Sequence, residues 1–167
     1  MDAAVSTSAR ATTAGEARYR LDYPLAPARA PRVIALDRGA DAIVRRVAAL
    51  PWDSARFYLS TGAPTSDGNG GDPDDLWLKE AAGLDARLSD VLAGVDAVIM
   101  VATNDEGAST AALVGAACTD RAIMSAGIIV GEHVVDRTVA ALRPHARILL
   151  VSEDQGDLDA LLLAVRA

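Results

Sequence analysis

Five short apolar runs, separated by segments with helical spacing, constrain the fold of this chain more than any other feature. The runs lie at residues 32–37, 57–59, 95–102, 123–130 and 147–151. Continuous apolar runs of this length are typical of parallel strands buried on both faces. Their alternation with helices predicts an α/β fold with a single doubly wound, mainly parallel five-stranded sheet and helices on both faces. We expect a Rossmann- or flavodoxin-like strand order of 2-1-3-4-5.

The chain divides into an N-terminal arm, residues 1–31, and an α/β domain, residues 32–167. The arm is rich in Ala, Arg, Ser, Thr and Pro without a sustained period, and disorder is the simplest expectation for residues 1–17. Apolar and polar side chains alternate over residues 19–25, which favours a short edge strand or a docking segment. One domain with a tail fits a length of 167 residues.

Two of the expected helices follow directly from the spacing and size of their side chains. After a glycine-rich loop at residues 61–75, Leu84, Leu88, Val91 and Leu92 form the apolar stripe of one helix, which Gly94 ends. A later helix, residues 108–119, is built from small residues, including Gly115, and we expect it to pack closely on the sheet.

Composition excludes several classes of partner and location. Apolar residues make up 51% of the chain but aromatic residues only 4%, so the core must be aliphatic. The net charge of −7 repels phosphate backbones and anionic lipids, which argues against nucleic acid or a membrane as partner. The one cysteine, Cys118, excludes an intramolecular disulfide and is expected to be a small core residue. The sequence shows no apolar span and no secretion signal, so we expect a cytoplasmic protein.

In a doubly wound sheet a ligand binds at the carboxyl ends of the strands, where the winding reverses. Here that crevice lies between the first and third strands of the expected sheet. The residues expected to line it are Asp37, Arg38 and Gly39 on one side, and Thr103, Asn104, Asp105, Glu106, Gly107, Ser109 and Thr110 on the other. Four more side chains follow the fourth and fifth strands at the same edge: Glu132, His133, Glu153 and Asp154.

Three interpretations of residues 104–110 compete. In the first, Asp105, Glu106, Ser109 or Thr110 only caps the following helix. In the second, the segment is a degenerate phosphate loop that presents backbone N–H groups to a nucleotide. Asp105 and Glu106 oppose that role, because their charges occupy the positive end of the helix. In the third, Asp37, Asp105 and Glu106 bind Mg²⁺ or Ca²⁺ through carboxylate oxygens.

Several common chemistries have no motif in the sequence. Neither a G-x-G-x-x-G fingerprint nor a G-x-x-x-x-G-K-[ST] loop occurs, which argues against a dinucleotide site or a P-loop. No lysine follows the fifth strand, as an aspartyl-phosphate receiver would require. His133 and His145 have no nucleophile at a supporting spacing, and we expect ordinary surface or connecting roles for them.

Three segments in order resemble the nucleotide-binding domain of the tubulin and FtsZ-like family. Residues 32–46 are similar to the first strand and glycine-led helix, residues 94–102 to the strand before the signature loop, and residues 141–151 to a later helix-to-strand passage. The family's glycine- and threonine-rich loop is reduced here to residues 104–110, with only Gly107 and Thr110 retained. The resemblance therefore implies a shortened relative with a degenerate glycine loop that has lost GTP hydrolysis.

These observations favour a degenerate nucleotide-binding-type domain that acts as a non-catalytic interaction module or weak ligand-binding module. Its partner would be another protein or a second copy. One alternative is a Mg²⁺-dependent enzyme that acts on a nucleotide or phosphate ligand in the acidic crevice, with Mg²⁺ or a nucleotide as the implied cofactor. Another is a subunit of a larger complex that docks through its N-terminal arm.

Overall fold

The computed structural model describes residues 30–61, 76–131 and 135–164, whose strands form one seven-stranded mixed sheet in the order β4-β3-β2-β1-β5-β6-β7. The strands are β1 (Arg32–Ala35), β2 (Arg56–Ser60), β3 (Trp77–Glu80), β4 (Asp85–Arg87), β5 (Ala97–Ala102), β6 (Met124–Val130) and β7 (Ile148–Ser152). The helices are α2 (Arg38–Ala48), α3 (Leu88–Leu92), α4 (Ala108–Asp120), α5 (Asp136–Leu142), α6 (Asp157–Ala164) and the 3-10 turn η3 (Asp105–Gly107).

The parallel part of the sheet has the strand order that the sequence predicts. The five apolar runs form β1, β2, β5, β6 and β7, and each neighbouring pair among them is parallel. Their order, β2-β1-β5-β6-β7, is the expected 2-1-3-4-5. The α/β class is therefore confirmed, but a sheet of only five strands is wrong.

The error lies in residues 76–92, where we expected one helix. The structure has an antiparallel hairpin, β3–β4, which adds two strands beside β2, followed by the short helix α3. Leu76 and Leu78 are buried while Trp77 and Lys79 are exposed, which is the two-residue period of a strand. Gly83 adopts a φ of +104° in the hairpin turn, a conformation that glycine takes without steric cost.

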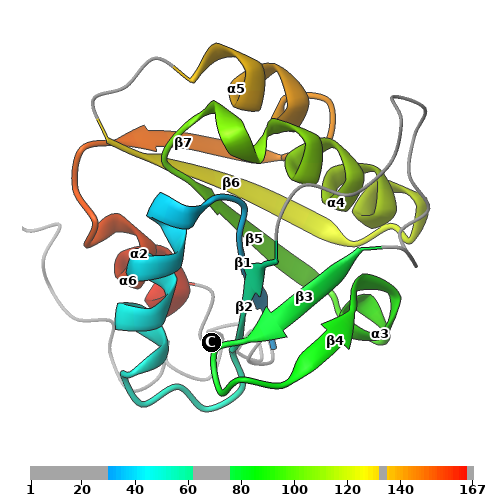
Figure 1. Cartoon of the computed structure of the whole chain (residues 1–167), viewed down its shortest axis with the longest axis vertical. Coiled ribbons are helices and arrows are strands. Elements are labelled where there is room, and N and C mark those ends of the chain that lie inside the picture. Colours follow the sequence, from blue (N-terminus) through cyan, green and yellow to red (C-terminus); the bar gives the residue numbers. More distant parts are fainter. Residues whose placement is uncertain (1–29, 62–75, 132–134, 165–167) are drawn as a thin grey trace, which may run out of the picture.

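The sheet has helices on both faces (Figure 1). One face carries α3, α4 and α5 over a core that includes Met100 and Ile129, and the other carries α2 and α6 over Val101 and Ile128. Successive residues of β5 and β6 therefore enter opposite cores, which explains why these strands are apolar without alternation. Cys118 is fully buried on the inner side of α4, as expected for a small core residue.

Parts of the sequence-based expectations concern residues outside the described ranges. They include the N-terminal arm up to residue 29, most of the glycine-rich loop, and Glu132 and His133. Among the helices that the structure describes, none has the length and apolar character needed to cross a membrane.

Candidate functional site

The carboxylate of Asp37 joins the carboxyl ends of β1 and β5, where the sequence places the ligand crevice. It accepts hydrogen bonds from the backbone N–H groups of Ala40 (2.9 Å), Thr103 (2.7 Å) and Asn104 (3.2 Å). The hydroxyl of Thr103 donates a fourth, at 2.7 Å. The Asp37 side chain itself is buried, with 5% of its surface exposed, while the bonds to Thr103 and Asn104 are partly buried. Both carboxylate oxygens are thus used inside the chain, one of them to cap α2.

The two glycines that resemble phosphate-binding positions are explained by contacts within the chain. A Cβ added to Gly39 would lie 2.0 Å from the hydroxyl oxygen of Thr103, the side chain that donates to Asp37. A Cβ added to Gly107 would lie 2.8 Å from the Cβ of Leu36 and 3.1 Å from its backbone carbonyl. Close packing of the β1 and β5 ends therefore accounts for both glycines without a ligand.

The segment after β5 is held to α5 as well. The amide oxygen of Asn104 accepts from the N–H of Glu106 (2.8 Å) and so caps η3. The carboxylate of Asp105 accepts from the N–H of Thr138 (2.9 Å), and the Thr138 hydroxyl donates to the carbonyl of Asn104 (3.0 Å). Asn104 thus caps η3, the following helix α4 has no side-chain cap of its own, and none of the four residues that we expected to cap the helix does so. Asp105 instead stabilises the first turn of α5.

An open pocket of about 410 Å³ lies beside this joint, toward β6 and β7. It is lined by Gly39, Ala42, Ile43, Thr103, Asn104, Val130, Gly131, Glu153 and Gln155. Among the lining residues that the structure describes, Glu153 is the charged one, so this part of the lining offers a carboxylate and no cationic side chain. A phosphate would meet repulsion from Glu153 without a compensating charge.

The expected site residues are therefore only partly brought together. Gly39, Thr103 and Asn104 line the pocket, whereas Asp37 and Asp105 are bonded within the chain. Three others are exposed (Arg38, Glu106 and Ser109), and Gly107 and Thr110 are buried. Within the described residues no three His, Cys, Asp or Glu side chains gather closely enough to bind a metal ion, so Asp37, Asp105 and Glu106 do not form such a cluster.

Burial also affects the next carboxyl group along α2. It raises the pKa of Asp41, and the charge of Asp37 adds to the rise, while Arg45 and Arg38 oppose it. One carboxylate oxygen of Asp41 is buried without a hydrogen-bond partner. Two acidic groups and two arginines therefore lie near this end of α2, so an added anion would meet charges of both signs.

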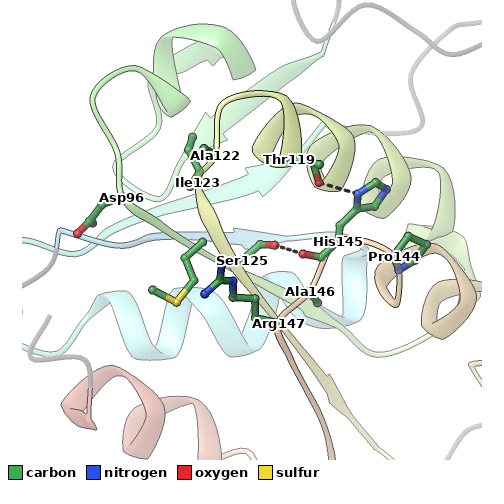
Figure 2. Close-up of a pocket in the computed structure, with 10 residues that line it drawn as sticks. Asp96, Thr119, Ala122, Ile123, Ser125, Pro144, His145, Ala146 and Arg147 are labelled. Carbon is green, nitrogen blue, oxygen red and sulfur yellow. Dashed lines mark hydrogen bonds between the residues drawn. The ribbon is translucent and has the colours of Figure 1, made fainter.

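A larger pocket, about 550 Å³, lies at the amino ends of the parallel strands, where β6 begins (Figure 2). Its lining comes from the end of α4, the start of β6 and the connection from α5 to β7: Asp96, Thr119, Ala122, Ile123, Met124, Ser125, Pro144, His145, Ala146 and Arg147. No sequence pattern indicates this pocket, because ligands of parallel sheets usually bind at the carboxyl ends of the strands.

His145 lies over α4 at this pocket, with Nδ1 of its ring 2.8 Å from the hydroxyl oxygen of Thr119. A Cβ on Gly115 would lie 2.6 Å from the ring, so only glycine leaves room for the histidine. Gly115 therefore serves the contact of α4 with the α5–β7 connection and not, as we expected, the contact with the sheet. The sequence signal for this contact was a glycine in the middle of a helix, which is unfavourable without a packing reason.

The geometry at this pocket does not assemble a nucleophile. The hydroxyl of Ser125 donates to the backbone carbonyl of His145 at 2.7 Å, and Figure 2 shows the imidazole directed away from it, toward Thr119. A serine nucleophile needs its hydroxyl bonded to the ring nitrogen of a base. Ser125 is also only 2% exposed, so it closes the base of the pocket and anchors the start of β7.

We expect the thiol of Cys118 to be unreactive in the folded protein. Burial raises its pKa from an ordinary 9.0 to about 12, and only the thiolate is a good nucleophile. Labelling by a disulfide reagent at pH 8 should therefore be slow in buffer and rapid in denaturant. Because the folded pKa is the higher one, the associated stability is complete below pH 9 and is lost as the pH rises toward 12. Rapid labelling of the native protein at pH 8 would contradict the burial of Cys118.

Comparison of the sequence with protein-family models and with curated proteins finds no match. The resemblance to the tubulin and FtsZ-like family thus stays a prediction from three short segments, and the function must be inferred from the geometry at the two ends of the strands.

Proposed function

We propose that this chain is a non-catalytic α/β interaction module of nucleotide-binding type, in which the former ligand edge serves to hold the fold together. The observation that carries the proposal is the carboxylate of Asp37, which accepts four hydrogen bonds from the chain itself. It occupies the junction of β1 and β5, where the ligand of such a fold is ordinarily bound.

The neighbouring contacts support the same proposal. Gly107 is buried against Leu36 and leaves no open space for a phosphate, and at Gly39 the hydroxyl of Thr103 already occupies the position that a Cβ would take. Asp105, which a metal-dependent enzyme would need, already accepts a hydrogen bond from Thr138. This hydrogen bond orients the Asp105 carboxylate toward the first turn of α5.

A second candidate function is weak binding of a small polar ligand, which the open pocket beside Asn104 and Glu153 favours. Its lining has amide and hydroxyl groups suited to a neutral or cationic molecule rather than to a phosphate. Binding of such a ligand would then change how the module interacts with its partner, and no reaction would take place in the pocket.

A thermal-shift titration with GTP and ATP, each with and without Mg²⁺, tests the proposal. A nucleotide at 100 times its Kd stabilises a protein by about 2.7 kcal/mol. In a domain of this size that raises Tm by roughly 5–10 °C. We expect a change of less than about 1 °C at millimolar nucleotide.

A Mg²⁺-dependent rise of several degrees with either nucleotide would contradict the proposal and favour the enzyme alternative. Asp105→Ala then separates the two cases. In a metal enzyme it abolishes the Mg²⁺-dependent rise, whereas in our proposal it only lowers the starting Tm by removing the contact to Thr138.

A further inference from the structure

The edge strand β7 is exposed and apolar along most of its length. Ile148 is 52% exposed, Leu150 37% and Val151 62%. Ile148 and Leu150 lie on one face of the sheet and Val151 on the other, because they pair with residues 126, 128 and 129 of β6. An apolar edge strand of this kind is a template for pairing with another strand.

The opposite edge of the sheet is protected in the usual way. β4 has only three residues, Asp85–Arg87, two of them charged, and a short charged edge strand disfavours pairing. β7 has five residues without a charge, Ile148–Ser152. The charges of β4 therefore disfavour pairing with another strand, whereas β7 has no charge that would prevent it.

The backbone of β7 also presents hydrogen-bonding groups outward. The carbonyl of Ser152 accepts from Gly131 at 2.9 Å, so it faces β6. Backbone groups of successive strand residues point to alternate sides. Those of Leu149 and Val151 thus face away from β6, and in the described part of the chain no strand pairs with them.

We propose that β7 pairs antiparallel with β7 of a second copy, with Leu150 on the two-fold axis. In this register Leu149 lies opposite Val151 of the second copy, and their outward backbone groups form the hydrogen-bonded pairs. Arg147 lies opposite Glu153 of the second copy, and both are exposed in the single chain. The two sheets then join into one continuous sheet.

The charge pattern is the reason to choose a second copy over another partner. One strand carries a cation before its apolar centre and an anion after it, at equal distances from Leu150. An antiparallel copy of the same strand therefore matches both charges twice, as an isologous interface requires. This inference depends on the proposed function, since it names the partner of the interaction module.

Sedimentation of the full-length protein tests the interface. Wild type should have the mass of two chains, and Val151→Lys should weaken association by at least about 100-fold, because it puts a charge on the apolar strand. The matched control is Leu84→Lys at the opposite edge, where Leu84 is 69% exposed. It should leave the mass unchanged.

Charge reversal tests the register. Arg147→Glu and Glu153→Arg should each weaken association by about tenfold, because each replaces two attractive pairs with two repulsive ones. An equal mixture of the two variants should regain wild-type association, since every pair across the interface then joins opposite charges. Failure of the mixture to recover would overturn this register.

A monomeric wild type would overturn the inference. These masses are measured without nucleotide, so the outcome is separate from the thermal-shift test. A dimer that binds GTP would contradict only the proposed function, and a monomer without nucleotide response would contradict only this interface.

Discussion

Asp37→Ala should lower the free energy of unfolding by about 3–5 kcal/mol, the largest loss that we expect from a polar substitution in this chain. The variant removes the cap of α2 and leaves the N–H groups of Thr103 and Asn104 without their acceptor. Buried donors without partners cost about 1–3 kcal/mol each. Urea denaturation followed by circular dichroism measures the change.

Two further variants test whether the loss of stability in Asp37→Ala comes from the hydrogen bonds of its carboxylate. Asp37→Asn keeps the shape and one acceptor oxygen but turns an NH₂ group toward other donors, so its loss should lie between wild type and Asp37→Ala. Asp53→Ala removes an exposed carboxylate and should change the free energy by less than about 0.5 kcal/mol. A loss below about 1 kcal/mol for Asp37→Ala would mean that the junction of β1 and β5 does not depend on this side chain.

Leu88→Ala should lower the free energy of unfolding by about 2–5 kcal/mol, whereas Leu84→Ala should change it by less than about 0.5 kcal/mol. Leu88 is fully buried at the start of α3, and truncation there leaves a cavity in the core. Leu84 is 69% exposed beside the hairpin turn. The pair is measured by the same urea denaturation.

This comparison also decides between the two descriptions of residues 76–92. In the single helix that the sequence pattern favours, Leu84 and Leu88 lie one turn apart on the same buried face, and both truncations would be costly. In the hairpin they are separated by β4 and lie in different environments. Similar losses for the two variants would therefore contradict the β3–β4 hairpin.

The β3–β4 hairpin shows why the helical spacing of apolar residues led to a wrong prediction for this segment. Leu84, Leu88, Val91 and Leu92 have helical spacing, and the alanines before Gly83 favour a helix. The alternation around Leu78 is only four residues long, so it is weak as a local signal. What makes it a strand is the neighbouring β2, whose backbone pairs with it from Tyr58 to Ser60.

The sequence predicts where the candidate site lies, but it does not predict which groups its side chains bind. The sequence places Asp37 and Asn104 at the same sheet edge, because both follow buried parallel strands. Whether the oxygens of Asp37 face a ligand or the backbone N–H groups of Thr103 and Asn104 depends on a few ångströms across β1 and β5, and no local pattern encodes that distance. His145 and Gly115 are a similar case, 30 positions apart in sequence and in contact in space.

The sequence by itself determined the α/β class, the five parallel strands and their order, since continuous apolar runs and right-handed crossovers depend on residues close together in the chain. Tertiary structure alone decided the hairpin edge, the internal bonds of Asp37 and the exposure of Val151. Each of these depends on which distant segment lies alongside, and the energies involved are contact energies between segments rather than preferences within one.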